Sequence, residues 1–264
     1  MSAIAQDKSP LGSSSIKMRF SGVPMERVSE TDTVYESGLS ISPIFDLRSE
    51  KGWGVTYSPS VLVSGSQSGI YMHTISAGYE RWGKKSFDIA FNYSHYFFTH
   101  NTNIPYSAIN NEVYFFLDYS KTWIKPVIAT SVGFGWDSSA TAVHDVGIAA
   151  GVSHNFDWKN KGMFSEIEMT PSAFVNVGTN GYFSFLQVSK YISNSHHFDS
   201  YVKHKGKGND TTPSLEFSNL ELNLETNFER GSFSLHPTGS VFFPMAAGDK
   251  TISAYGEFTL QYSF

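Results

Sequence analysis

Apolar and polar residues alternate along most of this chain. In the first long run, apolar side chains take every second position from Trp53 to Val63. Ser, Thr and Gly fill the positions between them, and only Leu62 departs from the pattern. Successive side chains of a β-strand point to opposite faces, so such a run predicts a strand with one apolar and one polar face. Comparable runs occur at residues 87–94, 112–119, 126–136, 146–156, 167–175, 220–224 and 233–243.

The length and composition of these runs distinguish a membrane barrel from a soluble β-protein. Several runs extend over about 10 to 14 residues, whereas soluble strands average about 5 to 6 and a tilted membrane strand needs about 9 to 11. No Asp, Glu, Lys or Arg occurs between Trp53 and Tyr79, although a soluble sheet normally carries charges on its exposed face. The pattern therefore predicts an all-β fold, a closed antiparallel up-and-down transmembrane β-barrel.

Weaker runs complete the predicted barrel. They lie at residues 38–48, 70–82, 182–192 and 251–264, and they bring the predicted number of strands to twelve. Fourteen strands are the alternative, with additional strands at residues 16–20 and within residues 193–214, where the alternation is poor. Prolines inside the runs are the main misfit, because each removes a backbone donor from a sheet. These prolines are Pro59, Pro126, Pro171 and Pro237.

The ends of the chain complete the domain prediction. Residues 1–5 contain the small-x-small sequence Ala3-Ile4-Ala5 and are a candidate remnant of a secretory signal peptide. Residues 6–35 are interpreted as an N-terminal tail or plug, and residues 36–264 as the barrel. With twelve strands, both ends of the barrel lie on one side, and short turns such as residues 49–52 would lie on the opposite side, where barrels usually carry long loops. One hidden strand would reverse that orientation.

The composition supports a membrane protein and excludes several functions. Aromatic residues make up 16% of the chain and charged residues only 16%, below the roughly 25% of soluble domains. The net charge of -5 provides no basic surface for nucleic acid, so no nucleic-acid partner is expected. The chain has no cysteine, which argues against disulfides and thiolate metal sites. No apolar run is long enough for a membrane-spanning helix.

The last ten residues carry the most specific motif. Glycine is followed by alternating apolar and aromatic residues up to a terminal phenylalanine, at Gly256, Phe258, Leu260, Tyr262 and Phe264. This motif resembles the C-terminal β-signal of bacterial outer-membrane β-barrel proteins as a general class. The resemblance implies a location in the bacterial outer membrane, contact with its lipid, and recognition by the barrel-assembly machinery.

Tryptophans and acidic residues give the candidate functional positions. Four tryptophans beside short, lysine-bearing turns predict an interfacial aromatic girdle: Trp53, Trp82, Trp123 and Trp158. The parity of the alternation predicts acidic residues facing the lumen. These residues are Asp46, Asp88, Glu112, Asp118, Glu166, Glu168, Glu221, Glu225 and Glu257. Rings of one charge select ions by sign, so an open lumen of this kind would favour cations or polar neutral solutes.

Catalytic chemistry has little support in the sequence, and we expect no enzyme activity, no cofactor and no metal. In the pairs Ser94 with His95 and Ser153 with His154, neighbouring strand residues face opposite ways and cannot meet. The histidines near residues 196–204 lie among lysines and are interpreted as solvated surface. The first functional prediction is a passive channel for small polar or cationic solutes. The alternative is a non-conducting structural or accessory subunit that binds other outer-membrane proteins.

Overall fold

A computed structural model describes residues 14–28, 33–63, 68–82, 86–99, 109–136, 142–179, 215–245 and 252–264. Within these residues the chain forms thirteen β-strands. The first seven are β1 (Ser14–Val28), β2 (Thr33–Arg48), β3 (Trp53–Val63), β4 (Gly69–Arg81), β5 (Phe87–Phe98), β6 (Ile109–Tyr119) and β7 (Lys125–Trp136). The others are β8 (Ala142–Ser153), β9 (Phe156–Lys161), β10 (Phe164–Gly178), β11 (Glu216–Arg230), β12 (Phe233–Pro244) and β13 (Ser253–Ser263). No helix in this part of the chain is long and apolar enough to cross a membrane.

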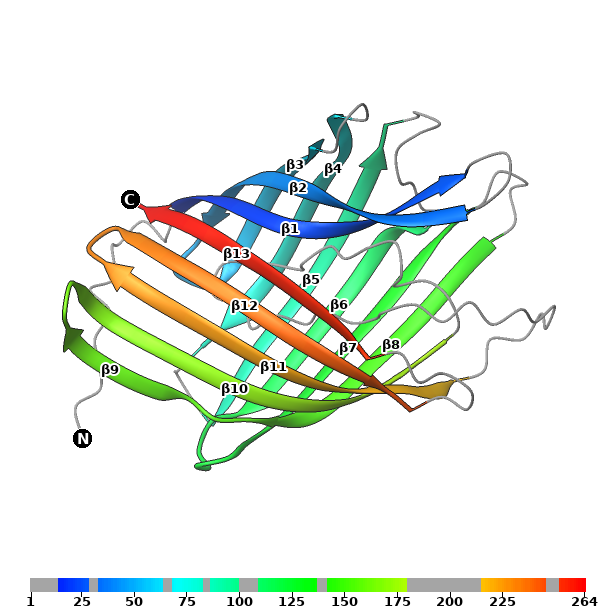
Figure 1. Cartoon of the computed structure of the whole chain (residues 1–264). Coiled ribbons are helices and arrows are strands. Elements are labelled where there is room, and N and C mark those ends of the chain that lie inside the picture. Colours follow the sequence, from blue (N-terminus) through cyan, green and yellow to red (C-terminus); the bar gives the residue numbers. More distant parts are fainter. Residues whose placement is uncertain are drawn as a thin grey trace.

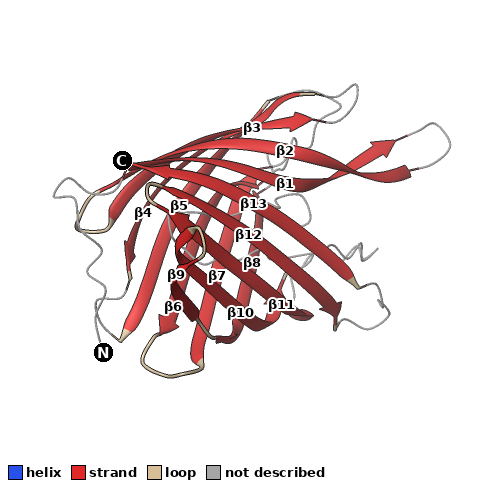
Figure 2. Ribbon diagram, turned by 60° about the vertical axis from the view of Figure 1, so that its left-hand side comes forward, coloured by secondary structure: helices blue, strands red, loops and turns tan. Residues whose placement is uncertain are grey.

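Twelve of the strands close into one antiparallel barrel. β1 pairs with both β2 and β13, and β10 pairs with both β8 and β11, so the ring has no open edge along its length. The short strand β9 pairs only with β10 among the described strands and extends the wall at one rim. Figures 1 and 2 show the tilted strands curving round into one closed wall. The predicted fold class and the number of barrel strands are therefore confirmed.

The membership of the ring differs from the prediction at two places. Residues 14–28 form β1 and residues 33–35 belong to β2, so the tail or plug assigned to residues 6–35 and the barrel boundary at 36 are wrong there. The predicted strand at residues 182–192 lies outside the described residues. β10 pairs directly with β11, from Val177 opposite Phe217 to Glu166 opposite Glu229, so nothing is inserted between them in the ring. Of the two strands considered for a fourteen-stranded barrel, residues 16–20 do belong to a strand, and residues 193–214 lie outside the described part.

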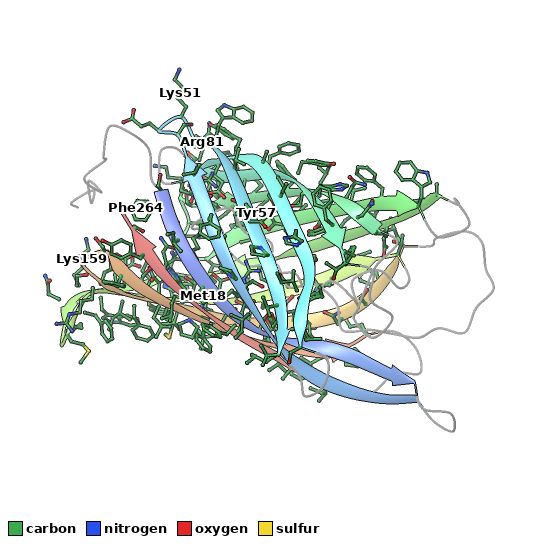
Figure 3. All side chains as sticks on the ribbon, turned by 90° about the horizontal axis from the view of Figure 1, so that it is seen from above. Met18, Lys51, Tyr57, Arg81, Lys159 and Phe264 are labelled. Atoms are coloured by element: carbon green, nitrogen blue, oxygen red, sulfur yellow. The ribbon has the colours of Figure 1, made fainter. Side chains whose placement is uncertain are left out.

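This exchange of strands also resolves the orientation. The connections at residues 49–52, 82–86, 120–124, 162–163 and 231–232 lie at the rim where Ser14 begins β1 and Phe264 ends the chain. Figure 3 shows Lys51, Arg81, Lys159 and Phe264 together at this end. The connections at the other rim vary in length, from the four residues 29–32 to residues 179–215. Compared with the prediction, the ring gains β1 at its start and has no strand inserted between β10 and β11. Each connection between these two places therefore moves to the opposite side of the barrel. The rim at which every connection is short therefore lies on the side of the C-terminus, as is usual for membrane barrels.

The two faces of the wall have opposite chemistry. In β3, every second side chain from Thr56 to Leu62 is buried: Thr56, Ser58 and Ser60 carry hydroxyls, and Leu62 is apolar. The alternate residues of β3 are apolar; Trp53, Val55, Tyr57 and Val63 are exposed, and Pro59 and Val61 are half-buried. A soluble protein buries its apolar side chains instead. The exposed apolar exterior and the polar interior are those of a barrel whose outer surface contacts lipid.

Prolines mark the places where backbone pairing is interrupted. β8 ends and β9 begins opposite Pro171, whose carbonyl accepts a hydrogen bond from the His154 amide at 3.1 Å but which has no N–H to return one. The β11–β12 register skips from Glu225 opposite Thr238 to Phe228 opposite Leu235, and the gap contains Pro237. Pro126 is the second residue of β7, at the rim. The barrel thus accommodates its prolines by losing individual ladder pairs.

Candidate functional site: the inward face of the barrel

Most of the predicted acidic residues lie on the inward face. Six of them are buried: Asp46, Asp88, Glu112, Asp118, Glu221 and Glu257. Glu225 is half-buried on the same face, opposite Thr238 of β12. Glu166 and Glu168 are also half-buried, but they lie near the short-turn rim, where β9 pairs with β10.

Three charged residues on this face, Lys17, Arg19 and Glu80, were not among the predicted lumen-facing residues. Lys17 and Arg19 were assigned to a tail, yet both are buried on the inward face of β1. The alternation of Ile16, Met18 and Phe20 with Lys17 and Arg19 was the available signal, but it extends over few residues. Glu80 lies in β4 at an inward parity and is also buried. The interior is therefore more mixed in charge than predicted.

A cluster of ions joins β2 to β4 near the short-turn rim. The Arg48 guanidinium lies 3.6 Å from the Asp46 carboxylate and 3.4 Å from the Glu80 carboxylate. Arg48 also donates to the carbonyl of Gly52 at 3.1 Å. Thr56 donates to Asp46 at 2.9 Å. Trp82 donates to the Glu80 carboxylate in the same way. Because hydrogen bonds hold both carboxylates, the arginine bridges two anions of fixed position.

A glycine on the intervening strand makes this bridge geometrically possible. Gly54 of β3 lies opposite Arg48 on one side and Gly78 of β4 on the other. A Cβ atom at Gly54 would lie 2.9 Å from Cζ of Arg48, closer than real contacts allow. The missing side chain therefore leaves the path along which Arg48 crosses β3 to reach Glu80.

Two other buried carboxylates are held by neutral donors. Glu112 accepts from the Tyr96 hydroxyl at 2.5 Å and from the Ser131 hydroxyl. Glu221 accepts from Ser240 at 2.9 Å and from the Asn176 amide at 3.1 Å. Hydrogen bonds of this kind stabilise a charged carboxylate away from bulk water. The interior thus carries oriented negative groups on β6 and β11 as well as the ion cluster on β2 and β4.

Part of the inward face is apolar, which the alternation did not predict. A buried cluster on β5 to β8 and β10 consists of Ala90, Tyr114, Phe116, Val127, Ala129, Ala149 and Phe174. Gly151 accommodates it, since a Cβ there would lie 2.4 Å from the ring of Phe174. These rings cover one side of the interior.

The predicted aromatic girdle is wrong for one of its members. Trp82 packs against Phe116, with ring centroids 5.5 Å apart, and donates from Nε1 to Glu80 at 3.0 Å. It therefore joins the inward apolar cluster to the ion cluster. Trp53 and Trp123 are 61% and 72% exposed at the short-turn rim, and Trp158 lies on β9 at the same end. Trp136 is exposed at the opposite rim.

The pair Ser94 and His95 lies as strand geometry requires. Ser94 is buried inside and its hydroxyl is hydrogen-bonded to that of Ser76, whereas His95 is on the outer face against Asn111. The described residues contain no group of three or more His, Asp or Glu side chains arranged to hold a metal ion. The histidines near residues 196–204 lie outside the described part.

An antiparallel ring closed by its first and last strands, apolar outside and charged inside, defines a transmembrane β-barrel of the outer-membrane type. No protein-family model and no curated protein sequence matches the chain.

Solved structures that match the chain include a porin and two autotransporter domains. The NanC porin matches at 8% identity and a TM-score of 0.46, covering 94% of this chain and 98% of that one. The beta domain of the Bordetella autotransporter Brka matches at 13% identity and a TM-score of 0.45, covering 96% and 100%. The translocator domain of the autotransporter NalP from Neisseria meningitidis matches at 11% identity and a TM-score of 0.44, covering 98% and 90%.

Proposed function

We propose that the protein is a bacterial outer-membrane channel that lets small polar solutes, and cations in particular, diffuse across the membrane. The observation that carries this proposal is the excess of acidic side chains buried on the inward face. They are Asp46, Glu80, Asp88, Glu112, Asp118, Asp145, Glu221 and Glu257, against Lys17, Arg19 and Arg48. Fixed negative charges along a pore raise the local concentration of cations and exclude anions.

The size of the inward side chains also supports a channel. Along β3 and β4 the inward positions include Ser58, Ser60, Thr74 and Ser76, all of them small. Barrels of about eight strands are filled by their own side chains, whereas those of 16 to 18 strands leave an aqueous pore. A twelve-stranded ring lined in part by serine and threonine falls between these limits, so a narrow path is the expectation.

A second candidate is a non-conducting structural or accessory subunit of a larger outer-membrane complex. The observation in its favour is the inward apolar cluster around Phe116, Tyr114 and Phe174. Together with Trp82, these rings fill part of the interior that a channel would leave to water. The two candidates differ in whether ions cross the folded barrel.

Single-channel recording in a planar bilayer under a salt gradient tests the proposal. Stable conductance steps with a cation-selective reversal potential are expected. Two substitutions on adjacent strands provide matched controls of opposite sign, because β1 and β13 are paired and both side chains are buried inside. Lys17→Gln should increase cation selectivity, and Glu257→Gln should decrease it.

Folding is checked separately by the heat-dependent mobility of the barrel on a gel. A folded, inserted barrel that never conducts would refute the channel and favour the accessory subunit. Conductance that is anion-selective, or that both substitutions leave unchanged, would refute the acidic-lumen mechanism.

A further inference from the structure

The seam between β2 and β3 lacks backbone pairing at its centre. The register runs from Leu39 opposite Val63 to Ile41 opposite Val61, and it resumes at Phe45 opposite Tyr57. The same register puts Pro43 directly opposite Pro59. In an antiparallel ladder every second opposite pair exchanges two N–H···O bonds, and two prolines can donate neither. The position of Pro43 opposite Pro59 therefore explains why residues 42–44 of β2 have no backbone pairing with β3.

Side chains hold the seam together on the inward face. The hydroxyls of Ser42 and Ser60 are hydrogen-bonded at 2.9 Å, and Ser40 is bonded to the Tyr71 hydroxyl at 3.1 Å. Side-chain bonds of this type break without disrupting the rest of the ladder. Both strands are also paired on their other sides, β2 with β1 and β3 with β4. The seam can therefore part locally while the barrel stays closed elsewhere.

Apolar side chains surround the seam on a face that is otherwise mainly polar. Ile44 follows Ser42 by two positions, Leu62 follows Ser60 by two, and Met72 lies opposite Ser60 on β4. Their exposed fractions are 2%, 0% and 2%, so they lie deep inside the wall. Arg19 of β1 is buried on the same face, opposite Ser42. The inner side of the seam thus offers apolar contacts beside a cation and several hydroxyls.

The outer side of the seam faces the bilayer. Phe45 and Tyr57 flank the prolines and are 45% and 40% exposed, and Figure 3 shows Tyr57 on this wall. Pro59 is the seventh residue of the eleven-residue β3, well away from both ends of the strand. A molecule that reaches the seam from outside must therefore come from the membrane and carry an apolar chain.

We propose that the Pro43–Pro59 seam is a lateral access site through which a single-chain anionic amphiphile, a long-chain carboxylate, passes from the bilayer into the barrel. Its chain contacts Ile44, Leu62 and Met72, and its carboxylate lies against Arg19 and the seam hydroxyls. This proposal is independent of ion conduction, which concerns passage along the barrel axis.

Reversible locking of the seam tests the proposal. The chain contains no cysteine, so an engineered pair has no competing thiol. Ser42→Cys with Ser60→Cys joins the proline seam. The matched control is Ser76→Cys with Ser94→Cys, which joins β4 to β5 within an uninterrupted ladder. Both serine pairs have hydroxyl oxygens 2.9 Å apart on the inward face, and directly opposite residues are within reach of a disulfide.

The readout is labelling by a long-chain carboxylate that carries a photoactivatable group near the end of its chain. The barrels are reconstituted in phospholipid vesicles and irradiated, and labelled peptides are mapped. We expect label at Ile44, Leu62 or Met72 in the unmodified barrel and in the locked control. The seam lock should reduce that label at least tenfold, and reduction of the disulfide should restore it.

Three outcomes would overturn the proposal: inward label that persists when the seam is locked, equal loss in the locked control, or no inward label in the unmodified barrel. An independent variant, Pro43→Thr with Pro59→Thr, restores two backbone donors without a cross-link. It should lower the inward label several-fold, and unchanged labelling would argue against the prolines as the cause. A negative result here leaves the conductance of the channel unaffected, so the two proposals fail separately.

Discussion

Replacement of Arg48 by methionine should destabilise the barrel through the two carboxylates that the arginine joins. The guanidinium lies 3.6 Å from Asp46 and 3.4 Å from Glu80, and all three side chains are buried. At an effective dielectric constant of about 20, each contact corresponds to roughly 4 to 5 kcal/mol of Coulomb attraction, and desolvation offsets much of it. Breaking a buried pair by removing one partner typically costs about 3 to 5 kcal/mol. Lys17 on the neighbouring strand β1 also attracts Asp46 and Glu80 and limits the loss. We therefore expect Arg48→Met to lower the free energy of unfolding by about 3 kcal/mol, the low end of that range.

A second substitution separates the charge effect from the loss of packing. Glu80→Gln combined with Arg48→Met leaves the net charge of the cluster as it was, and the amide oxygen can still accept from Trp82. The double variant should therefore regain more than half of the lost stability. The four proteins form a double-mutant cycle, in which the coupling energy of contacting ions is about 0.5 to 3 kcal/mol.

Urea unfolding of the refolded barrel in vesicles, followed by tryptophan fluorescence, measures these free energies by linear extrapolation. A loss below about 1 kcal/mol for Arg48→Met, or a coupling energy near zero, would show that the bridge contributes little.

Three other predictions concern packing, the aromatic girdle and assembly. Gly151→Ala should destabilise the barrel by about 1 to 3 kcal/mol, since its Cβ would lie 2.1 Å from the carbonyl oxygen of Ala173. Gly239→Ala, whose nearest neighbour lies at 4.0 Å, should be neutral in the same unfolding measurement, and equal losses would contradict the packing argument. In single-tryptophan variants, lipids with brominated chains should quench Trp53 and leave Trp82 largely unquenched; strong quenching of Trp82 would contradict its inward position. Phe264→Ala should slow insertion by purified assembly machinery several-fold without changing the stability of the folded barrel, and an unchanged rate would exclude Phe264 from the proposed recognition motif.

Much of the barrel could be predicted from alternation, because membrane strands must present lipid on one face and a polar interior on the other. β3 was predicted almost to the residue, from Trp53 to Val63. The parity of β6 also placed Glu112 and Asp118 inside correctly. These positions depend only on local periodicity, which a single sequence contains.

Positions that depend on neighbouring strands were not predictable in this way. β1 was not counted among the twelve strands because the alternation around Lys17 and Arg19 extends over few residues, and the acidic residues near these cations lie on other strands. Trp82 was assigned to the girdle because it adjoins a lysine-bearing turn, although its parity is that of the inward Glu80. The bridge from Arg48 to Glu80 requires Gly54 between them, and only the register reveals that arrangement.

The pairing of β1 with β13 has a consequence for the time course of folding. Nearly every other pairing in the ring joins strands that are neighbours in sequence, whereas this one joins Ser15 to Ser263. Contacts between such distant segments require closure of a long loop, which slows folding. Before that contact forms, the chain is an open sheet whose two terminal strands expose unpaired amides and carbonyls, at a cost of several kcal/mol for each group in hydrocarbon. The rate at which this protein reaches its final form should therefore depend on how well those two edges are shielded until they meet.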